Sequence, residues 1–181
     1  MRNIVDELEK HQIILFIIDS TNYNTTVVET IKNIPKDAGV IYVTLNKTAS
    51  ALQHHLTKEG ISPERFIIID CISKTIKDIQ DTEKIIYLDS PKALSNLSFV
   101  LTGVLQGNHK NMYILLDSLT TLLVYVDKPV AARFVLNIVN RIRNASCKSI
   151  LFTVNVDGHK DFFKEISIFV DHVFKATGTV E

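Results

Sequence analysis

Short runs of apolar, largely β-branched residues recur along this chain, and they constrain the fold more than any other feature. The first is IILFIID at residues 13–19, which is apolar at every position before its closing aspartate. A run of this kind predicts a strand buried on both faces, which is typical of a parallel sheet. Comparable runs predict further strands at residues 40–45, 66–70, 85–89, 112–117, 149–154 and 172–176.

Segments with helical periodicity lie between these runs. A short N-terminal helix places Ile4, Val5 and Leu8 on one face. Pro35 ends the next helix and Gly60 closes the one after it. Helices are predicted at residues 25–34, 49–59, 91–105, 129–144 and 160–169, whereas residues 73–84 fit either a short helix or a loop. The alternation predicts an α/β fold of three layers, α/β/α, with a mostly parallel central sheet and right-handed crossovers.

Length and composition narrow the class of protein. The 181 residues predict a single domain spanning residues 1–181, with residues 1–11 as an N-terminal helical appendage. Apolar residues make up 46% of the chain, enough for a full core. Lys+Arg and Asp+Glu number 20 each, so we expect no bulk attraction to nucleic acid or to a membrane surface. The two cysteines lie far apart and no apolar run reaches membrane-spanning length, which together predict a cytoplasmic protein.

The carboxyl ends of the strands are where function is expected in such a sheet. Asp117 follows four apolar strand residues and precedes Ser118, which is the Walker B pattern, in which the carboxylate holds Mg²⁺ or its water beside phosphates. The alternative is a strand that ends in a helix cap, because Asp and Ser are good N-caps. The same dipeptide occurs at Asp19-Ser20 and Asp89-Ser90, which favours capping for at least some of the three. Asp117 is therefore a candidate metal ligand whose alternative role is structural.

The segment after the first strand occupies the place of a phosphate-binding loop. Such a loop reads GxxxxGK[ST], because glycines let backbone N–H groups converge on the phosphates and the lysine neutralises them. Residues 19–26 read DSTNYNTT, with no glycine and no lysine. Thr25 or Thr26 could replace the metal-binding hydroxyl, and a helix N-terminus follows. The candidate residues of a degenerate nucleotide site are Ser20, Thr21, Asn22, Thr25, Thr26, Asp117 and Ser118.

Other polar residues have a structural and a functional interpretation. Arg133, Arg141 and Arg143 on the helix at residues 129–144 are typical of solvent-face charges, and the alternative is that they mark a partner surface. A polar cluster at residues 157–161 predicts a solvated turn, with contact to a ligand or a neighbouring subunit as the alternative. His54 and His55 are adjacent on a helix, so they point about 100° apart and cannot chelate one ion from the same face.

An ordered set of segments resembles the RecA-like ATPase superfamily, in particular its KaiC-like branch, which is widespread in archaea and bacteria. The similarity runs from about residue 13 to residue 176. It is carried by GVIYVTLNKTASALQHHLTKEGI at 39–61, IIYLDSPKALSNLSFVLTGVL at 85–105, MYILLDSLTTLLVYVD at 112–127, SILFTV at 149–154 and FVDHVFKA at 169–176. The resemblance implies a RecA-like fold of the P-loop NTPase type, with Asp117 as the Walker B carboxylate.

Two departures from that family bear on activity. The glycine-rich loop and its lysine would fall at residues 19–26 and are absent. The glutamate that activates water in the family would follow the second strand, where this chain has Asn46, which cannot act as a general base. We therefore expect a pseudo-ATPase without catalytic residues or cofactor, acting as a regulatory or protein-interaction module. Its expected partner is another protein or a second copy, and neither nucleic acid nor a membrane.

Two alternatives remain open at this stage. One is a weak nucleotide-binding protein that holds ATP and Mg²⁺ through Thr25, Thr26 and Asp117 with an atypical phosphate loop. The other is a small α/β enzyme with an unrelated site at the carboxyl edge of the sheet, around Asp19, Asp89 and Asp117. Convergence of these three carboxylates within metal-coordinating distance would favour the enzyme.

Overall fold

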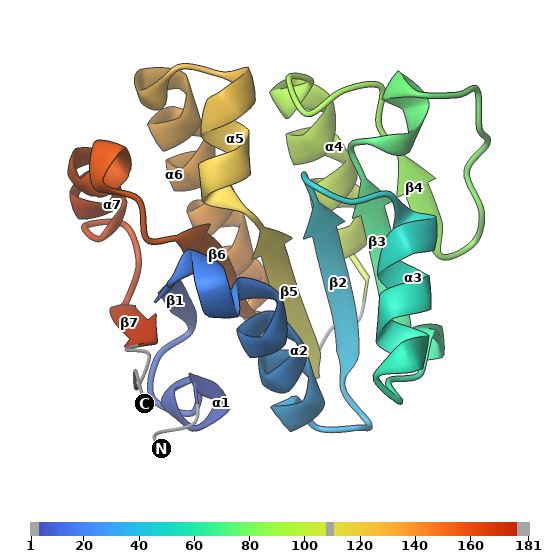
Figure 1. The fold of residues 1–181 in the computed structure, drawn as a ribbon, viewed down its shortest axis with the longest axis horizontal. Coiled ribbons are helices and arrows are strands. Elements are labelled where there is room, and N and C mark those ends of the chain that lie inside the picture. The colour runs from blue at the N-terminus through green and yellow to red at the C-terminus, as the bar shows by residue number, and fades with distance from the viewer. Residues whose placement is uncertain (1–3, 108–110, 177–181) are drawn as a thin grey trace.

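A computed structural model describes residues 4–107 and 111–176 of the chain. Its centre is one parallel sheet of seven strands (Figure 1). The strands are β1 Ile13–Ile18, β2 Gly39–Thr44, β3 Phe66–Asp70, β4 Ile85–Tyr87, β5 Met112–Asp117, β6 Lys148–Val154 and β7 His172–Ala176. Their order across the sheet is β4-β3-β2-β5-β6-β1-β7. The predicted α/β class is confirmed, and every described strand pair is parallel.

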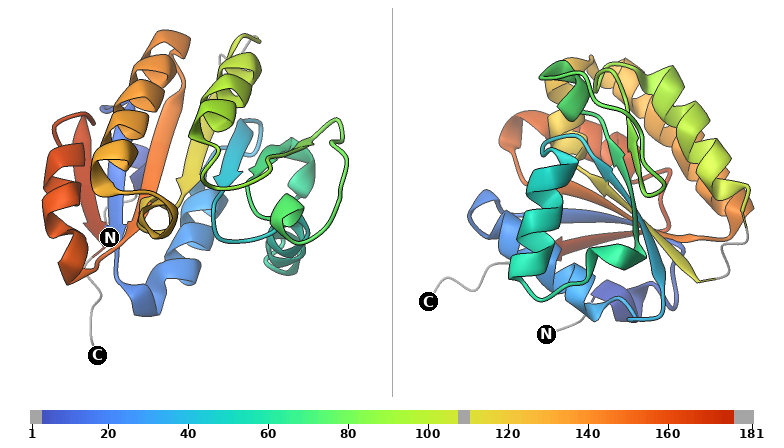
Figure 2. Two further views of the ribbon diagram at one scale, coloured as in Figure 1. Left: turned by 90° about the horizontal axis from the view of Figure 1, so that it is seen from above. Right: turned by 90° about the vertical axis from the view of Figure 1, so that its right-hand side faces the viewer.

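Helices cover both faces of the sheet, as the edge-on view in Figure 2 shows. The α-helices are α1 Ile4–Glu7, α2 Tyr23–Asn33, α3 Ala49–Lys58, α4 Leu94–Leu105, α5 Leu119–Tyr125, α6 Lys128–Ala145 and α7 Lys160–Ile166. Short 3₁₀ turns are η1 Ser20–Asn22, η2 Pro63–Arg65, η3 Ser73–Thr75 and η4 Asp157–His159. Helices α1 to α3 pack on one face, and α4 to α7 pack on the other.

Two hydrophobic cores result, one on each side of the sheet. In β1, Ile13 and Leu15 face the core beneath α4 to α7, while Ile14 and Phe16 face the core beneath α1 to α3. Successive side chains of a strand point to opposite faces, so a strand covered on both sides must be apolar throughout. Residues of α1 also belong to the second of these cores, so the N-terminal helix is packed against the domain.

Several element boundaries differ from those expected. The helix predicted at residues 25–34 begins two residues earlier, at Tyr23, and the one predicted from Pro91 begins at Leu94. Residues 73–84, whose sequence fits either a short helix or a loop, form the short turn η3 followed by a loop. A separate helix, α5, follows Ser118, whose hydroxyl accepts a hydrogen bond from the Thr121 N–H and so caps it.

Gly60 ends α3 as predicted. Its φ of +73° is the left-handed conformation that glycine adopts without a Cβ penalty. The N–H of Gly60 donates to the Thr57 carbonyl at 3.0 Å, and that of Ile61 donates to the Leu56 carbonyl at 2.9 Å. This pair of bonds is a Schellman motif, which satisfies the last carbonyls of the helix.

The outer edge of β4 is covered by the loop that precedes it. The Thr82 N–H donates to the Ile85 carbonyl at 2.9 Å, and the Tyr87 N–H donates to the Asp81 carboxylate at 2.9 Å. These bonds occupy edge groups that would otherwise be open to pairing with another strand. Among the helices at residues 4–107 and 111–176, none has the length and hydrophobicity of a membrane-spanning segment.

Candidate functional site at the carboxyl edge of the sheet

Asp117 ends β5 at the carboxyl edge of the sheet, and its side chain is completely buried, with 0% exposed. The Tyr23 hydroxyl donates to its Oδ1 at 2.6 Å, and the Asn46 amide donates to the same oxygen at 2.9 Å. The Tyr42 hydroxyl donates to Oδ2 at 2.6 Å. Three protein donors therefore satisfy the carboxylate, which avoids the large free-energy penalty of an unpaired buried charge.

Both tyrosines remain donors at neutral pH. Burial raises the pKa of the Tyr23 hydroxyl well above its ordinary value, and the negative charge of Asp117 raises it further. The same two causes, in the same order, raise the pKa of Tyr42. A buried phenol beside a carboxylate stays protonated, because ionisation would place two negative charges together away from water.

Strand register and helix position bring these residues together. Thr44 of β2 pairs with Asp117 of β5, which sets the end of β2 beside the carboxylate. Tyr42 lies two residues earlier, so it points to the same face as Thr44, the face beneath α1 to α3. Tyr23 is the first residue of α2 and is only 7% exposed, so its ring fills the space between the helix start and Asp117.

Asp70, at the end of β3, is a second buried carboxylate at this edge. It accepts hydrogen bonds from the N–H of Ala49 at 2.6 Å, and from the N–H groups of Ile72 and Ser73 at 2.7 and 2.9 Å. The Ser73 hydroxyl donates to it at 2.6 Å. Because Ala49 is the first residue of α3, Asp70 satisfies a free N–H at the start of that helix. Its role is structural.

The loop residues singled out from the sequence do not contribute to the hydrogen bonds of Asp117 among the described residues. Ser20, Thr21 and Asn22 form the exposed turn η1. Thr25 is exposed and Thr26 half-buried in the first turns of α2. Within the described residues none of these five hydrogen-bonds the Asp117 carboxylate, whose partners are Tyr23, Tyr42 and Asn46. Ser118 acts as the cap of α5.

The three Asp-Ser strand ends have separate partners. Asp19 accepts a hydrogen bond from the Asn155 amide at 2.9 Å, and Asp89 lies 3.8 Å from the Lys74 ammonium. Asp117 is held by the tyrosines and Asn46. Across residues 4–107 and 111–176, no group of three His, Cys, Asp or Glu side chains is placed to hold a metal ion. The convergence that an enzyme built on these carboxylates requires is therefore not found among them.

The environment of Asp117 does not fit a Mg²⁺ ion. Mg²⁺ binds through oxygen ligands in a near-octahedral shell and keeps several of its waters. Both oxygens of Asp117 instead face O–H or N–H donors, and neither has solvent access for a hydrated ion.

The remaining polar candidates have local roles. Asp157 pairs with Lys160 at 2.6 Å on the surface. Burial raises the pKa of the Cys71 thiol to about 12, with a further contribution from Asp70, so this cysteine is not a thiolate at neutral pH. His54 and His55 lie on α3, outside any metal-binding group of the described residues.

The sheet order and the helical layers define an α/β domain of the RecA-like fold. It is similar to the crystal structure of the KaiC-like protein PH0186 from the hyperthermophilic archaeon Pyrococcus horikoshii OT3, with a TM-score of 0.64 and 15% sequence identity over 94% of this chain and 74% of that chain. No family model matches the sequence, and no curated protein matches it. At this identity the similarity establishes the fold alone.

Proposed function

We propose that this chain is a non-catalytic RecA/KaiC-like domain that acts as a regulatory or protein-interaction module. One observation carries the proposal: the Asp117 carboxylate, the residue in the Walker B position, is buried and held by Tyr23, Tyr42 and Asn46. These three side chains take the place that a hydrated metal ion would occupy beside the carboxylate. The glycine-free loop at residues 19–26 supports the same conclusion, because it lacks the lysine that neutralises phosphates.

Loss of these groups removes most of what catalyses phosphoryl transfer. The reaction depends on positioning and charge neutralisation, and each 1.36 kcal/mol of lost transition-state stabilisation lowers the rate about tenfold. Without the loop lysine and a general base at Asn46, several kcal/mol of stabilisation are missing. We expect isothermal titration calorimetry with ATP and Mg²⁺ to show no binding, and a phosphate-release assay to show no turnover. Micromolar affinity together with turnover would overturn the proposal.

A second candidate function is weak nucleotide binding, which one contact favours. The Lys47 ammonium donates to the Asn24 side-chain oxygen at 2.7 Å, so a cation lies beside the first turn of α2 although the loop itself has none. A thermal-shift assay with a nucleotide panel separates the two candidates, because a ligand at one hundred times its Kd adds about 2.7 kcal/mol of stability. A rise in Tm that Lys47→Gln abolishes would favour nucleotide binding over the interaction module. No rise with any nucleotide is the result expected from the first proposal.

A further inference from the structure

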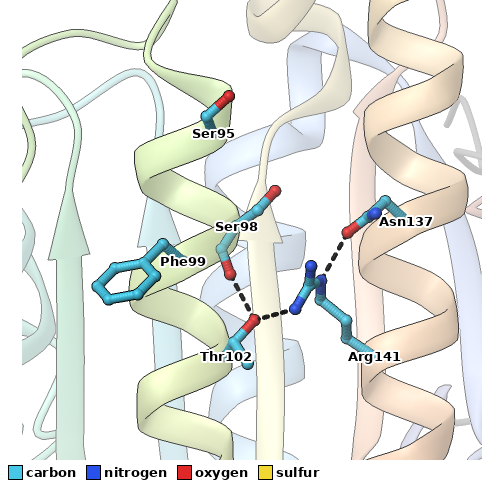
Figure 3. A pocket seen from close by; sticks show the side chains of 6 residues that line it. All are labelled: Ser95, Ser98, Phe99, Thr102, Asn137 and Arg141. Carbon is cyan, nitrogen blue, oxygen red and sulfur yellow. Dashed lines mark hydrogen bonds between the residues drawn. The ribbon is translucent and has the colours of Figure 1, made fainter.

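A groove of about 350 Å³ lies between α4 and α6 (Figure 3). Its lining residues are Ser95, Ser98, Phe99 and Thr102 from α4, with Asn137 and Arg141 from α6. The four residues of α4 follow helical i, i+3, i+4, i+7 spacing, so they form one stripe about two turns long. The groove is therefore a continuous surface made by two helices.

Arg141 is the charged group of this groove and has no carboxylate partner. Its guanidinium donates to the Asn137 side-chain oxygen at 2.6 Å and to the Thr102 hydroxyl, reaching across from α6 to α4 (Figure 3). No Asp or Glu of the described residues lies within ion-pair distance of it, whereas Arg143, two residues further on, pairs with Asp171. These neutral partners hold the Arg141 guanidinium in place and leave its positive charge uncompensated.

The helices around the groove extend this positive character. Neither α4 nor α6 contains an Asp or Glu residue. Arg133 is also exposed on α6, eight residues before Arg141 and about 80° from it around the helix axis. The net charge of the chain is zero, so this is a local excess of positive charge. An acidic ligand complements it, whereas two arginines are too few for the multiple phosphate contacts of a nucleic-acid site.

Phe99 adds an apolar contact point at the rim of the groove. The residue is 80% exposed on α4 and lines the groove, with its ring on the side of the helix away from Arg141 (Figure 3). Aromatic and arginine side chains together are the residues that most often dominate the binding energy of protein interfaces. An open groove that presents both fits an extended or helical peptide segment better than a small anion, which is usually bound in a closed site.

We propose that the α4–α6 groove binds an acidic segment of a partner protein, with a carboxylate on Arg141 and an apolar side chain against Phe99. This inference rests on the proposed role as an interaction module and names the chemistry of its partner. It also selects the partner-surface interpretation for Arg133 and Arg141, while Arg143 serves an internal ion pair.

A random dodecapeptide phage library panned on the full chain tests the proposal. We expect selected peptides to be enriched in Asp or Glu together with an aromatic or large aliphatic residue. Fluorescence polarisation with the consensus peptide should show affinity falling at least about tenfold in Arg141→Gln and in Phe99→Ser, as expected for loss of a charge-assisted bond or an apolar anchor. Lys58→Gln on α3, the matched control on the opposite face, should bind as the parent does. Arg141→Lys keeps the positive charge but not the guanidinium, so it should lose less affinity for the peptide than Arg141→Gln.

Several outcomes would overturn the proposal. They are failure to select any peptide, a consensus without acidic residues, and binding that Arg141→Gln leaves unchanged while circular dichroism shows a native fold. Polyuridylate binding that Arg141→Gln abolishes would assign the groove to nucleic acid instead. A dimer in sedimentation velocity that the same variant dissociates would assign it to a second copy. Turnover of ATP would contradict the proposed function but not peptide binding, so the two failures are distinguishable.

Discussion

Replacement of Tyr42 by phenylalanine is the most direct test of how the buried carboxylate is stabilised. The change removes one hydroxyl and no ring volume, so packing around β2 is preserved. What is lost is the 2.6 Å hydrogen bond to Oδ2 of Asp117, a residue with no solvent exposure. Hydrogen bonds to charged groups contribute about 1.5–3 kcal/mol, and the carboxylate cannot recruit water in exchange. We therefore expect Tyr42→Phe to lower the free energy of unfolding by about 2 kcal/mol.

Making the Tyr42→Phe change in an Asp117→Ala variant tests whether its effect comes from the hydrogen bond to Asp117. In Asp117→Ala the Tyr42 hydroxyl is buried without its acceptor, so removing it should no longer destabilise the protein and should even stabilise it slightly. Urea unfolding followed by far-UV circular dichroism measures the parent, the two single variants and the double variant, since the chain has no tryptophan to report by fluorescence. The matched control is Tyr113→Phe: Tyr113 is also buried, but its hydroxyl has no hydrogen-bond partner among the described residues, so we expect a change below about 0.5 kcal/mol.

An equal effect of Tyr42→Phe in the parent and in Asp117→Ala would show that the hydroxyl acts independently of the carboxylate. Equally mild effects of Tyr42→Phe and Tyr113→Phe would contradict the expected contribution of the hydrogen bond. Should Asp117→Ala not fold, the comparison of the two tyrosine variants in the parent chain still decides the point. Either of these two results would remove the main support for a site sealed by protein donors.

Three further predictions concern stability and reactivity. Gly60→Ala should destabilise the protein by about 1–2 kcal/mol in urea unfolding, because its φ of +73° is strained for any residue with a Cβ. Burial alone would raise the pKa of Asp171, but hydrogen bonds from Arg143 and from the N–H groups of Ile13 and Gln12 hold it below its ordinary value. The ionised Asp171 therefore stabilises the fold above its unfolded pKa of about 3.9, and this contribution is lost as the pH falls through the lower pKa of the folded state. We expect Asp171→Asn to have a lower free energy of unfolding than the parent at neutral pH, and the difference to disappear in acid. Cys71, with a pKa of about 12, should react with a thiol reagent only after urea unfolds the chain.

The fold was largely predictable because it depends on a signal repeated along the chain. Strands β1, β2, β3 and β5 are largely apolar on both faces, and that pattern has few solutions besides a parallel sheet covered on both sides. The first residues of helices are harder to predict, because tertiary contacts can set where a helix begins. The start of α2 at Tyr23 was missed because a tyrosine in a polar segment gives no capping signal, and its position is set by the tertiary contact with Asp117.

The site was predictable only in part, for a physical reason. Asp117 follows a strand, so its place at the carboxyl edge follows from periodicity alone. Its partners come from two other elements, and nothing local in the sequence indicates that the hydroxyls of Tyr23 and Tyr42 meet there. Tyr42 lies in an apolar strand run, so the sequence marks the position as buried but does not indicate the acceptor of its hydroxyl.

A buried carboxylate at the end of β5 constrains its own surroundings. Whatever the function of the chain, an aspartate with no solvent exposure needs donors, from a bound cation with its water shell or from the protein. Here the donors are the Asn46 amide and two phenols kept neutral by their own burial, so the carboxylate is satisfied by the protein. A ligand entering at Asp117 would have to displace Tyr23 and Tyr42 and replace both hydrogen bonds, at about 1.5–3 kcal/mol each. Binding at the α4–α6 groove requires no such displacement, and for that reason we place the interaction surface on the helices and not at the strand ends.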